Sequence, residues 1–369
     1  MVQPADFGFS EQHALLRESA KRYFAEHLPA DRLHALVAAD PNPHKSREAR
    51  WKPELWRQMA DLGWTMLAVP ESAGGIGLAA VAVAALCEEA GKAAFPSPLL
   101  ATVNTTYVLA ACESSSATSA LAAIAEGAAA SLVLYNERGR ECSTSRVERG
   151  RLTGVGYFVQ DAQKVAYFLV RAGSCLYWVA SEADGVTVHP DAIIDLTRDQ
   201  ATVSFEGVEA TLVSDDANAV LRQAMPAILT MLAADMVGAG EWQLQTTVEY
   251  AKTRQQFDRP LGFFQALKHP LVNVMIEVDK SKSLVYNAAC AIDTEPERAE
   301  AFAHMAKACA SEMARFASSR SIQFHGGIGF TWECFLHLYF KRQMHSQALW
   351  GDGAWHRSQL ASILMGAPH

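Results

Sequence analysis

The chain has 369 residues, of which 50% are hydrophobic, and it carries a formal net charge of −8 at pH 7. This length allows roughly two to three domains of about 150 residues with a large buried core. The acidic balance argues against nucleic acid as a main partner, because binding phosphates needs a basic face. No apolar run approaches the roughly eighteen residues of a membrane-spanning helix, so we expect no membrane span.

The N-terminus and the cysteines indicate the compartment. Residues 1–7 carry no charged-then-apolar leader, so the sequence reads as mature protein. The cysteines are scattered and form no CxxC pair, which disfavours a disulfide framework and a zinc site. They are Cys87, Cys112, Cys142, Cys175, Cys290, Cys309 and Cys334. We therefore expect a cytoplasmic protein without a metal centre.

The first segment, residues 1–122, is predicted to be helical. Apolar residues recur at helical spacing after Ser10, a suitable N-cap that is followed by Glu11 in the first turn. A second, Ala-rich helix is predicted over residues 78–91, and Pro96-Ser97-Pro98 breaks it.

The central segment, residues 123–217, has a different texture. Short β-rich runs are separated there by clusters of Gly, Asp and Ser, which indicates a small β-domain. The runs cover residues 130–135, 154–159, 166–170, 176–180, 186–189 and 201–205.

Residues 218–369 return to helical periodicity. The order helical, then β, then helical predicts an α+β fold with three domains. The apolar positions predicted to share a helix face are Leu229, Leu232 and Met236; Leu271, Met275 and Val278; and Met305, Cys309, Met313 and Phe316.

Two polar clusters in this last segment carry the chemical signal. One spans residues 254–269, and the other spans residues 323–333. The adjacent Gly326 and Gly327 have no side chains, so a bulky phosphorylated ligand can approach the backbone closely. A glycine run alone more often ends a helix, so the interpretation depends on both clusters together.

Together the clusters resemble the flavin-binding part of the acyl-CoA dehydrogenase family, and the resemblance covers nearly the whole chain. It implies an N-terminal helical domain (1–122), a central β-barrel or β-sandwich domain (123–217) and a C-terminal four-helix bundle (218–369). It also implies FAD, an acyl-CoA substrate and an electron-transfer flavoprotein as acceptor. The matching positions are Val69, Pro70, Glu71, Gly74, Gly75, Gly77, Glu88, Glu89, Ala90 and Gly91; Ile194, Asp195, Leu196, Thr197, Arg198, Val203 and Phe205; and Tyr250, Arg254, Gln256, Phe257, Pro260, Leu261, Phe264, Gln265, His269, Gln323, Gly326, Gly327, Gly329, Phe330 and Thr331.

The resemblance also gives roles to the two clusters. Arg254 resembles an arginine that meets the FAD pyrophosphate with its planar fork, and Phe257 an aromatic residue near the adenine. In this family such residues serve the flavin of a neighbouring subunit, which implies an oligomer. The alternative is a solvated arginine and polar residues that only cap helices. The remaining cofactor candidates are Gln256, Gln265, Gln323, Gly326 and Gly327.

The catalytic base of the family is not where the resemblance places it. In this family a glutamate removes the proton alpha to the thioester while hydride leaves for the flavin. When Arg357 is matched to the arginine that follows this glutamate, Trp350 stands in its place. Some relatives carry the glutamate on an earlier helix, where this chain has Ile228. Asp352, if the register slides, and Glu333 are the carboxylates left; each can equally be a capping or solvated charge.

Two flavin-holding motifs of the β-domain are also missing. Residues 134–140 replace a Thr-Glu-Pro-containing loop, and Phe158-Val159-Gln160 replaces an aromatic-Ile-Thr strand. The lost residues are those that a subunit uses for its own flavin, whereas the retained residues serve the neighbour's flavin.

We therefore expect a subunit of a heteromeric (α2β2) acyl-CoA dehydrogenase for a bulky substrate, such as a steroid side-chain thioester. It would lend FAD contacts to a homologous catalytic partner. Two alternatives stay open: a self-sufficient homo-oligomer using Asp352 or another base, and a non-catalytic scaffold. The intact polar clusters speak against the scaffold. Small residues at 79–85 and 238–240 permit either a wide acyl cavity or close helix packing.

Overall fold

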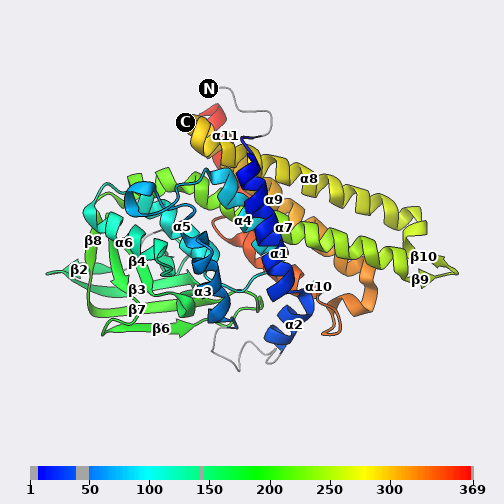
Figure 1. Cartoon of the computed structure of the whole chain (residues 1–369), viewed down its shortest axis with the longest axis horizontal. Coiled ribbons are helices and arrows are strands. Elements are labelled where there is room, and N and C mark those ends of the chain that lie inside the picture. Colours follow the sequence, from blue (N-terminus) through cyan, green and yellow to red (C-terminus); the bar gives the residue numbers. More distant parts are fainter. Residues whose placement is uncertain (1–6, 39–49, 142–144, 367–369) are drawn as a thin grey trace. The chain divides into compact units, whose positions relative to one another are not determined.

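The computed structural model describes residues 7–38, 50–141 and 145–366 (Figure 1). Residues 1–6, for which the sequence predicts no leader, and Cys142 lie outside the described residues. The other cysteines are free thiols. The chain forms two compact units: one comprises Met1–Ala39, Ala79–Phe95 and Leu229–His369, and the other Asp40–Leu78 and Pro96–Ile228.

The β-containing unit holds two four-stranded sheets, ordered β1-β4-β5-β8 and β2-β3-β7-β6. The pair β1–β4 is parallel, and the other pairs of these sheets are antiparallel. All the predicted β-rich runs contain strands. The strands are β1 (Ala130–Val133), β2 (Arg146–Glu148), β3 (Arg151–Gln160), β4 (Tyr167–Ala172), β5 (Cys175–Ala180), β6 (Val186–Pro190), β7 (Gln200–Glu209) and β8 (Thr211–Ser214).

The core of this unit lies between its sheets and under its helices. Phe168 of β4 and Phe205 of β7 are fully buried and meet edge to face at 6.2 Å between ring centroids. Helix α5 packs on β1, and α6 packs on β8. The helical elements are α3 (Pro53–Asp61), η1 (Trp64–Met66), η2 (Glu71–Ala73), α5 (Leu99–Ala110), α6 (Ser115–Ala125) and η3 (Ala162–Lys164).

The other unit is helical. Its first helix begins as predicted, because the Ser10 side chain accepts the His13 N–H at the N-cap. Most of the long helix α7 belongs to it. Its elements are α1 (Glu11–His27), α2 (Ala30–Ala38), α4 (Ala80–Lys92), α7 (Ala217–Thr253), β9 (Gln255–Gln256), β10 (Arg259–Pro260), η4 (Leu261–Phe263), α8 (Gln265–Thr294), α9 (Pro296–His325), η5 (Gly326–Phe330), α10 (Leu336–Ala348) and α11 (Gly353–Met365).

Small residues bring α4 and α7 into backbone contact. A Cβ on Gly238 would lie 1.9 Å from the Glu88 carbonyl oxygen, and one on Gly91 would lie 2.0 Å from the Asp235 carbonyl oxygen. Neither contact is possible with a side chain, so both positions need glycine. Of the two interpretations of these small residues, the structure supports close helix packing.

A buried ionic network joins α1, α4 and α8. The Glu88 carboxylate accepts from Arg17 Nη2 at 2.6 Å, from Lys282 Nζ at 2.7 Å and from the Tyr286 hydroxyl at 2.7 Å. Burial and the Glu88 charge raise the pKa of Tyr286 far above its ordinary value. A buried carboxylate is tolerated when its charge is compensated in this way.

The predicted α+β order of helices, small β-sheets and helices is confirmed. The predicted domain boundaries at residues 122 and 217 stay predictions. Helix α4, which belongs to the first predicted segment, packs in the helical unit with α1 and with α8 of the last predicted segment. One face prediction is wrong: Met275 of α8 is exposed, because the buried stripe follows Leu271, Val274 and Val278.

Within the described ranges, α7 is the one helix long and apolar enough to cross a membrane, judged by length and composition. Most of its apolar window is buried inside the structure.

Candidate functional site

The ends of α7 and α9 lie side by side and bring the two polar clusters together. The rings of Tyr250 and His325 stack at 4.2 Å between centroids with an interplanar angle of 19°. The Tyr250 hydroxyl donates to the His325 carbonyl oxygen at 3.5 Å. One turn later the Arg254 N–H donates to the Tyr250 carbonyl oxygen at 2.8 Å. Residues far apart in the sequence are thus brought together. We call residues 254–265 and 323–327 the nucleotide surface, after the role that the sequence resemblance predicts for them.

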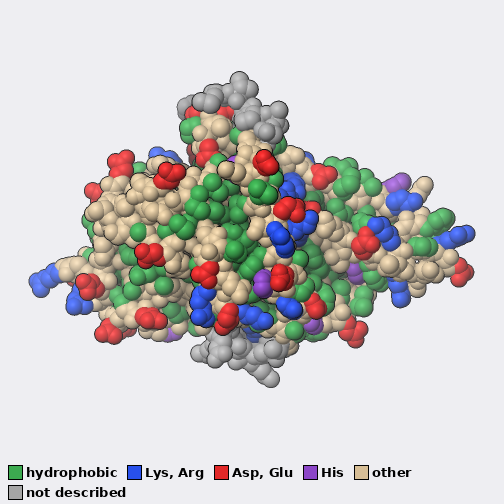
Figure 2. Space-filling view, viewed as in Figure 1, with side chains coloured by type: hydrophobic (Ala, Val, Ile, Leu, Met, Phe, Trp, Pro, Cys, Tyr) green, Lys and Arg blue, Asp and Glu red, His purple; other side chains and the backbone are tan. Residues whose placement is uncertain are grey.

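A strained hairpin forms the edge of this surface. In β9 and β10, Gln256 pairs with Arg259, and Phe257 and Asp258 form the turn with φ of 55° and 57°. Both central positions of such a turn favour Gly, Asn or Asp, so Phe257 is held in an unfavourable conformation. Its ring is 87% exposed. Figure 2 shows hydrophobic and basic side chains together at the surface where Figure 1 places this hairpin. Local strain of this kind is typical of binding sites.

The glycine run forms the adjoining wall. Gly326 has φ 64° and ψ −144°, a conformation that is essentially reserved for glycine. A Cβ added at Gly326 or Gly327 would meet nothing within 4 Å, so this backbone is open to a ligand. Gly329 differs, because a Cβ there would lie 3.0 Å from the Ile322 carbonyl oxygen. The first two glycines therefore provide access, and the third allows packing.

The polar side chains of the nucleotide surface point away from internal partners. Arg254, Gln265 and Gln323 are exposed, and none makes a side-chain hydrogen bond or ion pair to another described residue. Gln256 Nε2 donates to the neighbouring Gln255 carbonyl oxygen at 2.8 Å. An exposed guanidinium and an open glycine backbone are groups that can bind a phosphate.

The second part of the candidate site is the loop of residues 349–353, which leads into α11. Trp350 and Gly351 are both left-handed, with φ of 59° and 99°. The Asp352 carboxylate accepts the Trp355 N–H at 2.9 Å and is the N-cap of α11. The structure thus gives Asp352 a capping role. Ile228, in the other position of the family base, is fully buried.

A buried lysine holds this loop through hydrogen bonds to its backbone. Lys307 of α9 has no exposed surface and donates to Ser311 Oγ at 3.0 Å. It also donates to the carbonyl oxygens of Gln347 at 3.2 Å and Gly351 at 2.9 Å. Burial lowers the pKa of Lys307 to about 7, against the opposing effect of the Asp352 charge. Lys307 therefore closes the end of α10 and fixes the course of the loop.

Two histidines complete this buried layer. His304 Nδ1 and His356 Nδ1 lie 2.8 Å apart, a distance that places one shared proton between the rings. Burial, followed by the charge of Lys307, lowers the pKa of His356 to about 3, and burial lowers the pKa of His304. Both rings are therefore neutral near pH 7 and act as packing and hydrogen-bonding groups.

In the β-containing unit, Gln160 occupies the position of the expected threonine. Its Nε2 donates to the Phe158 carbonyl oxygen at 3.1 Å and to Gln200 Oε1 at 3.0 Å, which uses both amide hydrogens. Phe158 has φ 58° and lies at an irregularity in the β3–β7 register, a bulge that turns the strand. Gln160 is thus engaged inside its own sheet.

Comparison with known proteins identifies the family. The model of the acyl-CoA dehydrogenase C-terminal domain matches residues 222–365, and that of the N-terminal domain matches residues 10–128. The chain is 31% identical over 343 residues to acyl-CoA dehydrogenase IpdE2 of Mycolicibacterium smegmatis, covering 93% of this chain and 95% of that protein. The chain belongs to the acyl-CoA dehydrogenase family.

Two solved structures resemble the chain over almost its full length. One is the ChsE4-ChsE5 complex from Mycobacterium tuberculosis, with TM-score 0.86 and 25% identity, covering 98% of this chain and 100% of that chain. The other is a variant of the Tcur3481-Tcur3483 steroid ACAD, with TM-score 0.85 and 26% identity, covering 96% and 98%. The predicted enzyme class, an oxidoreductase of acyl-CoA, is confirmed, and membership in the family supports a flavin cofactor.

Sequence reasoning found the exposed candidate residues but missed the side chains that support them. The pairing of Tyr250 with His325 depends on two helix ends that only the fold brings together. Lys307 and His304 could have been noticed, because they interrupt an Ala-rich stretch of helix. A charged residue in such a stretch is unusual and signals a buried partner.

Proposed function

We propose that this chain is a subunit of a heteromeric FAD-dependent acyl-CoA dehydrogenase and lends its nucleotide surface to FAD held by a homologous catalytic partner. The observation that carries the proposal is the contrast between this open surface and the positions of the base, which hold Trp350 and Ile228. A tryptophan or an isoleucine cannot take the proton alpha to a thioester. The partner would supply the glutamate.

The nucleotide surface fits the phosphate and adenine end of FAD. Arg254 would bind pyrophosphate oxygens through its guanidinium, and the open backbone of Gly326 and Gly327 would accept a close approach by the nucleotide. Gln256, Gln265 and Gln323 would add polar contacts, with Phe257 beside the adenine. Bound flavin supplies the hydride acceptor for dehydrogenation.

The positions at which the family holds its own flavin support the same division of roles. Gln160 uses both amide hydrogens in hydrogen bonds within its sheet, and the Asp352 carboxylate accepts the N-cap hydrogen bond of α11. The capping bond of Asp352 speaks against the self-sufficient enzyme that would use it as base. The open nucleotide surface speaks against a scaffold without flavin.

The substrate class proposed is a bulky acyl-CoA, such as a steroid side-chain thioester. Support comes from the steroid ACAD among the similar structures and from ChsE4-ChsE5, which is a complex of two named components. A cytoplasmic α2β2 assembly with an electron-transfer flavoprotein as acceptor is the arrangement that we propose.

A flavin measurement tests the proposal. The chain purified alone should be nearly colourless, and co-expression with its homologous partner should give a yellow complex. Arg254→Ala should lower the FAD affinity of the complex about tenfold or more, the loss of a charge-assisted phosphate contact. Arg22→Ala, which removes an exposed arginine of α1, is the matched control and should have no effect. A chain that alone binds stoichiometric FAD and oxidises an acyl-CoA would contradict the proposal.

A further inference from the structure

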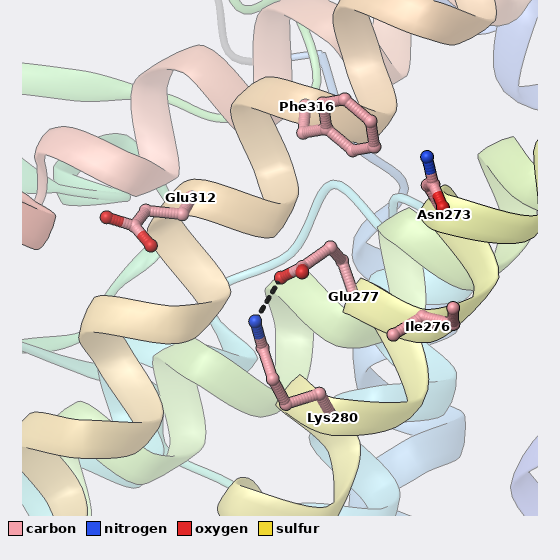
Figure 3. Close-up of a pocket in the computed structure, with 6 residues that line it drawn as sticks. All are labelled: Asn273, Ile276, Glu277, Lys280, Glu312 and Phe316. Carbon is pink, nitrogen blue, oxygen red and sulfur yellow. Dashed lines mark ion pairs between the residues drawn. The ribbon is translucent and has the colours of Figure 1, made fainter. Parts of the chain in front are cut away.

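The groove between α8 and α9 is a poor candidate for a ligand site, because its charged groups are paired within the chain. Its volume is about 400 Å³, and it is lined by Asn273, Ile276, Glu277, Lys280, Glu312 and Phe316 (Figure 3). Lys280 Nζ lies 2.5 Å from Glu277 Oε2, and Glu312 forms an ion pair with Arg357 of α11. Buried polar groups without a partner lie in another part of the same unit, where α2 meets the start of α10 (Figure 1).

Two imidazole nitrogens are buried at this contact. His34 Nε2 of α2 and His337 Nε2 of α10 are shielded from solvent, and neither makes a hydrogen bond to another described residue. His337 as a whole is only 5% exposed. A neutral ring can present a lone pair at this nitrogen, whereas a charged ring would bury an N–H group and a charge without an acceptor. The contact therefore favours the neutral form of both histidines.

Aromatic contacts hold both rings against the segment that joins the glycine run to α10. The centroid of the His34 ring lies 5.7 Å from that of Trp332 and 5.0 Å from that of Phe335. The His337 ring meets the Trp332 ring edge to face at 4.6 Å between centroids. Lys341 Nζ lies 5.2 Å from the centre of the same indole ring. Trp332 thus contacts an imidazole from each helix and an ammonium group.

Backbone hydrogen bonds connect Trp332 to the glycine run. The Thr331 N–H donates to the Ile328 carbonyl oxygen at 3.1 Å, and the Cys334 N–H donates to the Thr331 carbonyl oxygen at 3.2 Å. Helix η5, which forms the glycine run, also packs on α10. A displacement of Trp332 would therefore move the backbone wall of the nucleotide surface.

The charges around His337 oppose its protonation. Burial, followed by the charges of Lys341 on α10 and His34 on α2, lowers the pKa of His337 to about 4 from its ordinary 6.5. Glu333 and Cys334 are the titratable groups of the joining segment, and Glu333 is exposed. No carboxylate of the described residues, and no charged group of α9, which also packs on α10, acts on His337 to favour its charged form. Between pH 6.5 and pH 4 the unfolded chain binds more protons, so the contact is complete near pH 7 and weakens as pH falls through this range.

We propose that His34 and His337 are positioning residues for the nucleotide surface, acting through Trp332. While both rings are neutral, they hold Trp332 and with it the glycine run; acid charges the His337 ring, which then leaves the contact and releases the segment. The effect on FAD rests on the proposed function, whereas the contact itself does not depend on it.

Hydrogen exchange of the full chain, followed by mass spectrometry, tests the release by acid. The protection of residues 326–335, corrected for the intrinsic pH dependence of exchange, should fall about tenfold or more from pH 7 to pH 5, because a released imidazole takes up protons in this range and the buried one does not. His337→Phe and His337→Gln cannot be protonated and should remove this fall. His189→Gln, which removes an exposed histidine of β6, is the matched control and should leave the fall unchanged.

Substitutions of His34 test the positioning role at pH 7. His34→Ala should lower the protection of the same residues, and His34→Phe, which keeps a ring against Trp332, should restore it. In the complex with the homologous partner, His34→Ala should weaken FAD binding about threefold or more, because the arrangement that binds is then less populated. His34→Phe should bind FAD as the parent complex does.

Several results would overturn this inference: protection of residues 326–335 that does not change with pH in the parent chain, the same fall in both His337 variants, or unchanged protection with His34→Ala. Arg254→Ala in the same FAD assay keeps the two proposals apart. If Arg254→Ala weakens FAD binding and His34→Ala does not, the positioning role is wrong and the proposed function stands. If neither weakens it, the proposed function and the effect of the contact on FAD both fail.

Discussion

Two parts of the helical unit, the nucleotide surface and the loop of residues 349–353, use their polar groups in opposite ways. The nucleotide surface leaves Arg254 and the backbone of Gly326 and Gly327 open, whereas the loop of residues 349–353 is satisfied internally by Lys307 and by the Asp352 cap. Polar groups in folded proteins are nearly always paired when buried. Internally paired groups indicate a structural role, whereas open groups are free to bind the ligand that we propose. We therefore propose ligand binding for the first part and a structural role for the second.

The largest effect on stability should come from Lys307→Met. The substitution removes the ammonium donor from the carbonyl oxygens of Gln347 and Gly351, and leaves Gln347 only the Ser311 hydroxyl at 3.5 Å. We expect this to cost about 1–3 kcal/mol in the free energy of unfolding. A urea titration measures the loss. A variant as stable as the parent chain would contradict this contrast, because the loop of residues 349–353 would then not depend on Lys307.

The same lysine gives stability a pH dependence. Burial lowers the folded-state pKa of Lys307 to about 7 from its ordinary 10.5. Between these values the unfolded chain binds more protons, so this group makes stability rise with pH, and its contribution is lost as pH falls through about 7. Lys307→Met should flatten this rise between pH 7 and pH 10, compared with the parent chain. An identical pH profile in both would show that Lys307 does not titrate as described.

Two glycine substitutions sharpen the first half of the comparison. Gly326→Ala forces a side chain into a backbone conformation reserved for glycine, which should cost about 1–2 kcal/mol in the free energy of unfolding. Gly327→Ala places its Cβ in open space and should leave stability unchanged while weakening FAD binding in the complex. Normal FAD binding by a stable Gly327→Ala variant would show that the backbone of Gly326 and Gly327 does not contact FAD.

The smallest expected effect concerns Asp352. Asp352→Ala removes the N-cap of α11 and should cost about 1 kcal/mol, whereas Asp352→Asn keeps an acceptor for the Trp355 N–H and should cost little. The turnover of the complex with Asp352→Asn should equal that of the parent complex. Loss of turnover in this variant, with stability retained, would make Asp352 a base and revive the self-sufficient enzyme.

The elements that the sequence predicted are those whose signal is local. β-Rich runs between clusters of Gly, Asp and Ser identified the long strands, and the Ser10 cap marked the first helix. Strand β2 (Arg146–Glu148) escaped because it is short and charged, and Met275 was placed on the wrong face because it is adjacent to the buried stripe. The exposed candidates of the site were visible in the sequence as residue types. The stacking of Tyr250 on His325 and the support from Lys307 were not, because topology, and not spacing, brings these groups together.

We propose that the nucleotide surface binds FAD and that the loop of residues 349–353 only shapes the fold. Measuring both FAD affinity and unfolding free energy for Arg254→Ala and Lys307→Met in the complex tests it directly. We predict that Arg254→Ala loses FAD and keeps its stability, while Lys307→Met loses stability and, at temperatures where it stays folded, keeps FAD. Unchanged FAD affinity with Arg254→Ala would contradict the account.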